Sequence, residues 1–594
     1  MTIPLGASPR PGLGHLLNDP TKRRVLVVVG CLLYLGLALL LCREMWSPGL
    51  VVAGGPPDNE QKVWEIGWWA FSLTHGLNPL YTTYLSPAGH PINLMWNNST
   101  PLLALLAVPL TLLVGAVTSF NLLVVLAIWL DASVAFLCLR ALTPRIWSAW
   151  LGGLLFGFSP FVYTQLNSGR LPWLALFLLP VMLVLLRQLL VSRPRRRLLL
   201  GLEVGLVASA QLLLSEELLA TSCLMVALTL LVLAIARPGQ VARFLDYSMP
   251  VLAIAAATAL AICGYPLWMQ FFGPGHAIHG SVLNLSSTVS VLSSFLVPTQ
   301  YQAISLGLPA SRTASLAYRA VSTSYLGLPL LVLASWAAVR GRGDLVTRVA
   351  AIMTVGTLAL SMGPWLDVSG SATGIPLPWV VLAHIPLLRL AAPQRLMVFA
   401  YLGLAVVVAR APTFQWTRRQ RLALTALGAL SGLALAPASA AFFVTVPDPG
   451  FFGSGGVRSI QPGSELVVAP SPISTLSPSD AAMIWQVQSD YRFRMTWASI
   501  IQIGQDGHAA AESPPSVLDS AVLASQAGQG GAPTSSVLQA MRAELHSWDV
   551  AGVIVGPSPH EAQIVGLFQL VLRTAPKYQD GVYVWSTWDQ PSAS

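Results

Sequence analysis

Long apolar segments separated by short polar ones recur along the first 440 residues of this 594-residue chain. Many are long enough to cross the roughly 30 Å hydrocarbon core of a bilayer as helices. We therefore expect a polytopic α-helical membrane protein. The pattern predicts about eleven spans, at 25–42, 121–139, 147–164, 172–191, 198–214, 218–236, 249–268, 325–340, 346–364, 397–414 and 422–443.

Basic residues between the apolar segments predict the orientation, because Lys and Arg accumulate in cytoplasmic loops. Lys22 and the two arginines after it precede the first span, so residues 1–24 are expected to form a cytoplasmic tail. Segment 101–114 is too short to span at about 1.5 Å per residue, so we expect an interfacial or re-entrant helix there. With that assignment every later basic cluster falls on the cytoplasmic side. Residues 43–120 then form a large first outer loop.

The composition changes near residue 445, where Gly, Pro, Ser, Asp and Gln become frequent and apolar runs shorten to strand length. Residues 25–444 are thus expected to form the membrane domain, and residues 445–594 a small extracytoplasmic α/β domain. Strands are predicted at 465–469, 550–555 and 581–585, and helices at 480–488, 535–546 and 560–573. Within the membrane domain, a second short apolar piece at 379–390 is expected to lie along the membrane interface.

Composition and charge narrow the possible functions. Hydrophobic residues make up 54% of the chain and charged residues 10%, and the mean hydropathy is +0.65. The net charge of +9 is distributed over short loops, so it does not indicate a nucleic-acid partner. All five cysteines lie in or at the ends of apolar segments, so neither a disulfide framework nor a thiolate metal motif is predicted.

The first outer loop contains the most concentrated acidic residues of the chain. Asp58, Glu60 and Glu65 lie within eight positions of one another. Residues 59–75 are predicted to form an amphipathic helix that holds these acids near the bilayer surface, with tryptophans at the membrane interface. Asp58 and Glu60 are therefore candidates for a general base or a cation-binding pair, although two solvated acids in a polar loop would show the same spacing. The tryptophans are Trp64, Trp68 and Trp69.

Other charged residues of the predicted outer face are candidates for binding substrate. Arg170 lies in the short second outer loop, and Arg389 and Arg395 flank the interfacial segment. An outer arginine opposes the usual charge bias and can bind a lipid phosphate through paired hydrogen bonds, or it can simply anchor the chain among headgroups. Glu216 and Glu217 occupy a tight outer turn, from which one of them can face the bundle or both can face water.

Polar and aromatic residues of the first loop are candidates for binding sugar hydroxyls or stacking on a sugar ring. Within the spans, Asp131 and Glu203 are expected to form interhelical hydrogen bonds. His276 and His279 form no metal-binding pattern, and no metal ligand is assigned. The sugar-binding candidates are His75, Asn78, Trp96 and Asn97.

This plan resembles the GT-C superfamily of membrane glycosyltransferases, which includes oligosaccharyltransferase catalytic subunits, protein mannosyltransferases and actinobacterial cell-wall arabinosyltransferases. The resemblance is clearest over 20–270, where one outward span leads into a long loop with an early acid. The runs Gly-Leu-Asn-Pro-Leu at 76–80 and Leu-Met-Trp-Asn-Asn-Ser at 94–99 look like those of actinobacterial members. The resemblance implies that Asp58 is catalytic and that Glu60 is a second acid.

The resemblance also implies a function: transfer of a sugar from a polyprenyl-phosphate-linked donor to an extracytoplasmic acceptor, by an inverting general-base mechanism. The acceptor would be a cell-envelope glycan, a glycolipid or a protein. No acid occurs between Gln165 and Arg170, unlike in the metal-dependent members, so a divalent cation, Mg²⁺ or Mn²⁺, stays open. A lipid-linked glycan transporter (flippase) and a non-catalytic membrane scaffold remain as alternatives, although no repeat symmetry indicates a transporter.

Overall fold

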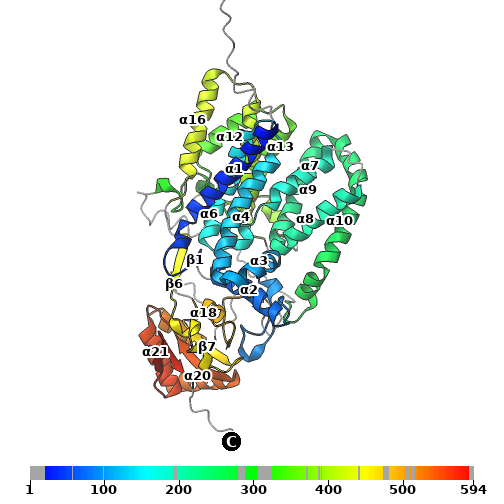
Figure 1. Cartoon of the computed structure of the whole chain (residues 1–594). Helices are drawn as coiled ribbons and strands as arrows, with labels where there is room; N and C mark the ends of the chain where they lie inside the picture. Colours follow the sequence, from blue (N-terminus) through cyan, green and yellow to red (C-terminus); the bar gives the residue numbers. More distant parts are fainter. Residues whose placement is uncertain are drawn as a thin grey trace, which may run out of the picture.

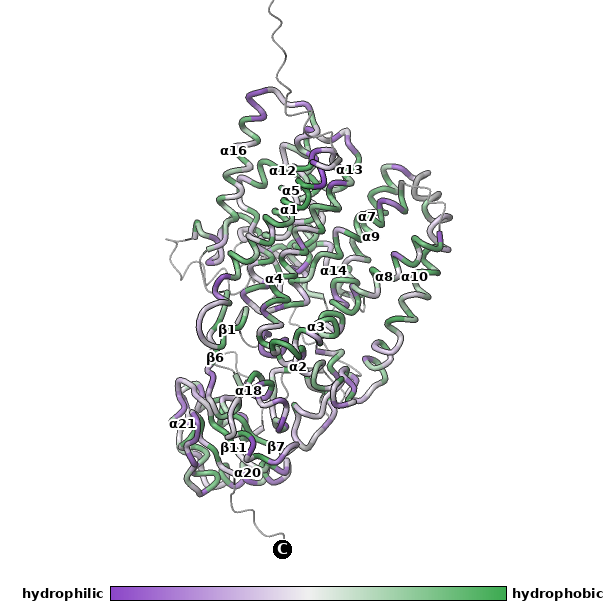
Figure 2. The backbone as a smooth tube through the Cα atoms, viewed as in Figure 1, coloured by the Kyte–Doolittle hydropathy of each residue, from purple (hydrophilic) through white to green (hydrophobic). Residues whose placement is uncertain are grey.

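A computed structural model shows a bundle of helices with a small mixed sheet at one end (Figure 1). The structure describes residues 20–55, 58–97, 99–191, 197–277, 288–305, 324–368, 372–385, 388, 391–438, 442–472, 481–503, 509–510 and 516–586. Apolar residues follow the helices along their length, whereas hydrophilic residues gather at the bundle end where α16 begins and in the sheet part (Figure 2).

Eight helical segments in the described part of the chain are long and apolar enough to cross a membrane, which agrees with a polytopic membrane protein. They coincide with predicted spans because continuous apolar side chains leave only helix as a backbone that satisfies its own hydrogen bonds in lipid. The helices are α1 (Pro20–Leu41), α4 (Ala116–Leu139), α5 (Ile146–Gly157) continued by α6 (Pro160–Asn167), α7 (Leu178–Val191), α8 (Arg197–Leu214), α9 (Glu216–Ala236), α10 (Pro238–Phe272) and α15 (Met397–Arg410). Short flanking turns extend the segments of α7 and α15 to Leu171–Leu190 and Pro393–Thr413.

The three remaining predicted spans also form helices, but they do not meet the same criteria. Two of them, α12 (Leu328–Arg340) and α13 (Leu345–Ser361), have 13 and 17 residues, fewer than the roughly 20 that a straight span needs. The third, α16 (Arg418–Leu435), has 18 residues and begins with a basic turn closed by a capping box at Thr417. The total of eleven spans therefore stays a prediction.

Segment 101–114 forms helix α3 (Pro101–Val114), 14 residues long with Pro109 inside it. In the described residues of the second short apolar piece, α14 (Trp379–Leu382) is helical, with Trp379 fully buried and Val381 71% exposed. Its position along the membrane interface stays a prediction.

The C-terminal part contains a five-stranded sheet of order β12-β13-β11-β7-β8, in which β7 runs parallel to both β11 and β8. The predicted strands and helices of this part are all present. Valines of β7 and β11 pack with Leu518, Phe568 and Trp585 to form its core. The elements are β7 (Glu465–Ala469), β8 (Arg494–Met495), β11 (Val550–Val555), β12 (Lys577–Gln579), β13 (Val582–Trp585), α18 (Ala482–Gln488), α19 (Val517–Gln526), α20 (Ser535–Ser547) and α21 (Glu561–Leu572).

Short elements connect these larger parts. Strand β1 (Leu50–Ala53) pairs antiparallel with β6 (Phe443–Val446), which joins the start of the first outer loop to the chain that enters the sheet part. The other short strands are β2 (Tyr81–Thr82), β3 (Ile92–Asn93), β4 (Trp365–Asp367), β5 (Ala372–Pro376), β9 (Gln502–Ile503) and β10 (Ala509–Ala510), and α17 (Gly450–Gly453) is a short α-helix. The 3-10 helices, labelled η, are η1 (Arg43–Trp46), η2 (Pro87–Gly89), η3 (Leu94–Trp96), η4 (Leu171–Trp173), η6 (Leu292–Phe295), η7 (Ala303–Ser305), η9 (Pro393–Leu396), η10 (Ala411–Thr413) and η11 (Val457–Ser459).

Helix α2 (Asp58–Thr74) forms where an amphipathic helix was predicted, between the bundle and the sheet part (Figure 1). Its three tryptophans are buried in the protein, whereas the prediction placed them against lipid headgroups. Trp64 and Trp68 stack on each other with ring centroids 5.3 Å apart and pack against Tyr491 of the C-terminal part. The Trp64 indole donates to Gln486 Oε1 over 2.6 Å. The aromatic face of α2 therefore binds the sheet part.

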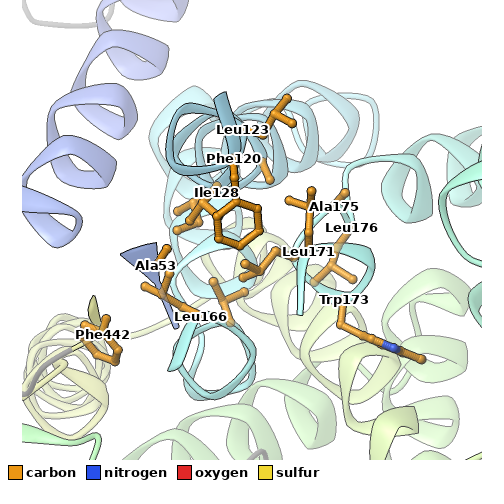
Figure 3. Packing of buried hydrophobic residues seen from close by; sticks show 14 of the residues in the cluster. Ala53, Phe120, Leu123, Ile128, Leu166, Leu171, Trp173, Ala175, Leu176 and Phe442 are labelled. Atoms are coloured by element: carbon orange, nitrogen blue, oxygen red, sulfur yellow. The ribbon is translucent and has the colours of Figure 1, made fainter. Parts of the chain in front are cut away.

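An apolar cluster supports the loop that carries Arg170. Phe120 and Ile128 of α4 pack against Leu166 and Leu171, the residues on either side of that loop (Figure 3). Trp173 lies at the edge of this cluster with its ring directed away from Phe120 (Figure 3). Burial of Leu166 and Leu171 thus fixes the ends of the loop while its polar residues stay near the surface.

Candidate functional site

Two glycines bring the first outer loop into backbone contact with the loop between α6 and η4. Gly54 and Gly169 have φ angles of +77° and +65°, a conformation that favours glycine. A Cβ atom on Gly54 would lie 2.1 Å from the Gly169 nitrogen, and one on Gly169 would lie 2.6 Å from Asn59 Cβ. Gly55 N donates to Asn167 O over 2.8 Å. Only residues without side chains permit this approach.

The contact places Asp58 against Arg170. Arg170 Nε donates to Asp58 Oδ2 over 2.7 Å, and the two side chains are 30% and 33% exposed. Asp58 is the first residue of α2, so its carboxylate also lies at the positive end of the helix dipole. The bond uses Nε, and none of the hydrogen bonds among described residues occupies the two Nη atoms. The structure thus presents a partly exposed carboxylate beside a guanidinium that retains donors.

A second ion pair, between Arg395 and Glu217, is connected to the Arg170 segment through Trp173. Trp173 N donates to Arg170 O over 2.9 Å, and the Arg395 guanidinium stacks over the Trp173 ring at 4.6 Å. Arg395 Nη1 bonds Glu217 Oε2, and Ala392 N donates to Glu217 Oε1 over 3.0 Å. The predicted candidates Arg395 and Glu217 therefore meet each other, and Trp173 joins them to Arg170.

Glu216 faces the bundle rather than water. It accepts a hydrogen bond from Gln270 Nε2 over 2.7 Å, near the end of α10. Gln270 O accepts in turn from the Trp96 indole over 2.7 Å, and Asn78 Nδ2 donates to Tyr265 Oη over 2.6 Å. Trp96 and Asn78 thus fasten the first loop to α10 on the side that also carries Glu216.

The remaining candidates of the first loop lie apart from the two ion pairs. Asn97 is 1% exposed, and its side chain bonds both backbone groups of Ile501, so it connects the loop to the C-terminal part. His75 is exposed and stacks on Phe71 with ring centroids 4.1 Å apart. Arg389 and His279 lie outside the described residues. The substrate-binding roles of all these residues stay predictions.

Glu60 and Glu65 lie inside the protein, unlike Asp58. Glu60 is 2% exposed on the first turn of α2. Lys62 Nζ bonds both oxygens of Glu65 at 3.1 and 3.0 Å. Burial raises the pKa of the Glu65 carboxyl, and the neighbouring Lys62 ammonium opposes that rise. These acids therefore do not share a surface site with Asp58.

The donor set does not fit a divalent cation well. Mg²⁺ and Mn²⁺ bind several oxygen ligands, most often carboxylates and water. Here the Asp58 carboxylate, which is one-third exposed, is already paired with the Arg170 guanidinium. Among the residues that the structure describes, no group of three or more His, Cys, Asp or Glu side chains is placed to hold a metal ion.

Some residues of the site were missed by reasoning from the sequence. Trp173 had no role assigned, and no local signal indicates its cation–π contact because the partner, Arg395, is distant in the sequence. Gln270 lies at the end of an apolar segment, and neither Gly54 nor Gly169 had a role assigned. Of the two acids expected to form interhelical hydrogen bonds, Asp131 is fully buried and accepts from Leu176 N over 2.8 Å. Glu203 is exposed, and none of the hydrogen bonds among the described residues involves it, so that prediction is wrong.

The arrangement of membrane helices, first-loop helix and sheet part is a fold shared with a solved membrane protein, and this likeness of fold agrees with the resemblance seen in the sequence. The chain is similar to the mycobacterial arabinofuranosyltransferase AftD, with 15% identity, a TM-score of 0.53, and coverage of 96% of this chain but only 40% of that one. A variant of AftD matches with 14% identity and the same TM-score. ArnT from Cupriavidus metallidurans, bound to undecaprenyl phosphate, aligns over 95% of this chain with a TM-score of 0.38. Neither a protein-family profile nor a curated protein matches the sequence.

Proposed function

We propose that this protein is an integral membrane glycosyltransferase that moves a sugar from a polyprenyl-phosphate-linked donor to an acceptor on the outer side of the membrane. The observation that carries the proposal is the partly exposed Asp58 carboxylate, held by Arg170, with a second guanidinium, Arg395, stacked on Trp173 three residues further along the chain. The fold shared with an arabinofuranosyltransferase supports the same class of reaction. The acceptor is a cell-envelope glycan, a glycolipid or a protein.

In the proposed reaction Asp58 is the general base. Its carboxylate takes the proton of an acceptor hydroxyl, and the acceptor oxygen attacks the anomeric carbon from the face opposite the lipid phosphate. The bond between the anomeric carbon and the phosphate oxygen breaks, and the phosphate keeps the electron pair. One displacement inverts the configuration at the anomeric carbon.

In this scheme Arg170 and Arg395 bind the leaving phosphate. Arg170 has both Nη atoms for the phosphate while Nε holds Asp58, so one side chain orients the base and binds the charge that develops. Arg395 is held flat on Trp173 and by Glu217, which preorganises its guanidinium before substrate arrives. Planar guanidiniums suit phosphate oxygens because they donate paired hydrogen bonds. No step in the scheme uses a metal ion.

The test is turnover by the purified full-length protein with a panel of polyprenyl-phosphate sugars and short glycan acceptors. The proposal expects release of polyprenyl phosphate that depends on the acceptor, together with a product of inverted anomeric configuration. Transport of a labelled lipid-linked glycan across proteoliposomes without any product would instead identify a transporter. Thermal stabilisation by donor without turnover on any acceptor would identify a binding scaffold. Either of these results would overturn the proposed transferase.

A further inference from the structure

A large apolar cavity lies away from the two ion pairs, between α16 on one side and α1, α5 and α12 on the other. Its volume is about 1130 Å³. Helix α16 packs against α12 and stands at the edge of the bundle (Figure 1), so the cavity separates it from α1 and α5. The lining includes Leu37, Leu41, Leu154, Leu333 and Leu435.

The charges that line this cavity lie at its two ends. Arg145 and Arg421 line one end, beside Trp147 and Trp416. Those residues share one end of the bundle because Arg410 Nη1 donates to Leu142 O over 2.6 Å, which joins the α4–α5 connection to the end of α15. The lining residues of this end carry two positive charges and no acid. At the other end Arg43 lies beside Glu44, so the formal charges there cancel.

Apolar walls with arginines and tryptophans at one end are typical of a lipid-binding site. Basic pockets between membrane helices bind anionic headgroups on the cytoplasmic side, and tryptophans mark the headgroup level. The Arg145 end is the end that the basic loops predict to be cytoplasmic. The apolar walls follow α16, whose 18 residues extend about 27 Å at the helical rise of about 1.5 Å per residue. Acyl chains can therefore lie along it from the headgroup inwards.

We propose that the cavity is a binding site for one anionic diacyl phospholipid of the leaflet at the Arg145 end. Its phosphate lies on the guanidiniums of Arg145 and Arg421, and its acyl chains lie along α16. The lipid fills the space between α16 and the α1–α5 pair and fastens this helix to the bundle. The site is independent of the transferase chemistry proposed above, since it lacks Asp58 and both phosphate-binding arginines.

The test compares phosphatidylglycerol with phosphatidylcholine on the delipidated full-length protein, with thermal stability and native mass spectrometry as readouts. One phosphatidylglycerol is expected to bind and to raise the unfolding temperature more than phosphatidylcholine does. The double variant Arg145→Gln with Arg421→Gln should bind phosphatidylglycerol about thirtyfold more weakly, because each arginine near a membrane surface contributes roughly fivefold. Arg419→Gln, on the same helix but outside the lining, is the matched control.

A second variant tests the cavity without changing charge. Gly432 lines the cavity, and a Cβ there would meet nothing within 4 Å, so Gly432→Trp places an indole in the acyl-chain space. It should abolish lipid binding, whereas Gly356→Trp, which also has open space but lies outside the lining, should not. Equal binding of both phospholipids, or unchanged phosphatidylglycerol binding in Gly432→Trp, would overturn the proposal. Binding of polyprenyl phosphate in place of phosphatidylglycerol would overturn it too.

Discussion

Replacing Asp58 by Asn separates catalysis from stability at the candidate site. The Asp58–Arg170 pair is about one-third exposed, and ion pairs with that exposure stabilise proteins by roughly 0.2–1 kcal/mol. Asn also keeps an oxygen that can accept from Arg170 Nε. We therefore expect the unfolding temperature of Asp58→Asn to change little. A general base, by contrast, contributes about 10²–10⁴-fold to rate, so sugar transfer should fall by that factor.

The assay is polyprenyl phosphate release under saturating donor, with donor binding measured separately by thermal stabilisation. The variant should still bind donor, because both arginines remain. The exchanged pair Asp58→Arg with Arg170→Asp is the sharper control, since it restores the ion pair but moves the carboxylate to the other loop. It should fold and remain inactive. Transfer within about threefold of wild type in Asp58→Asn, or recovery in the exchanged pair, would refute the general-base assignment.

Three further predictions concern the elements that position the site. Trp64→Ala leaves a cavity between α2 and the sheet part and should lower the free energy of unfolding by about 3–5 kcal/mol, which is measured as faster proteolysis of the C-terminal part. Trp46→Ala, at a residue 65% exposed, is the control. Gly169→Ala should lower transfer more than Gly76→Ala, because both have positive φ but only Gly169 has close neighbours; equal losses would contradict this. Burial raises the pKa of Glu465 to about 8, so its folded carboxyl keeps a proton that the unfolded chain releases above its ordinary pKa. Stability should therefore fall as pH rises towards about 8, and Glu465→Gln should flatten that decline in the unfolding temperature.

Hydropathy alone located the membrane helices, because transfer of apolar side chains into lipid outweighs local propensity over segments of this length. The strands at 465–469 and 550–555 were equally predictable, since short β-branched runs bounded by polar residues leave few alternatives. The position of α2 was not predictable. A tryptophan that faces lipid and one that faces another domain look the same in a sequence, and only Tyr491 and Gln486 show which applies to Trp64.

The ion pairs show a second limit of sequence reasoning. Asp58 and Arg170 were each recognised as candidates, yet 112 positions separate them, and 178 separate Glu217 from Arg395. Charge type and predicted side of the membrane identified the individual residues, but neither property specifies a partner at that distance. The glycine contact that joins the two outer loops could be inferred only from the backbone, where a Cβ would collide.

Helix α2 links the candidate base to the C-terminal part directly. Asp58 is its first residue, and Trp64, less than two turns later, donates its indole hydrogen to Gln486 and accepts at its backbone oxygen from Tyr491. A packed helix moves as a unit, so a shift of the sheet part at Trp64 is transmitted to Asp58 rather than absorbed between them. Arg170 is fixed from the other side, through Leu166 and Leu171 in the bundle core, and the glycine contact joins its loop to the start of α2. The Asp58–Arg170 distance of 2.7 Å is therefore set from two sides, and an acceptor that displaced the sheet part would act on the proposed base through α2.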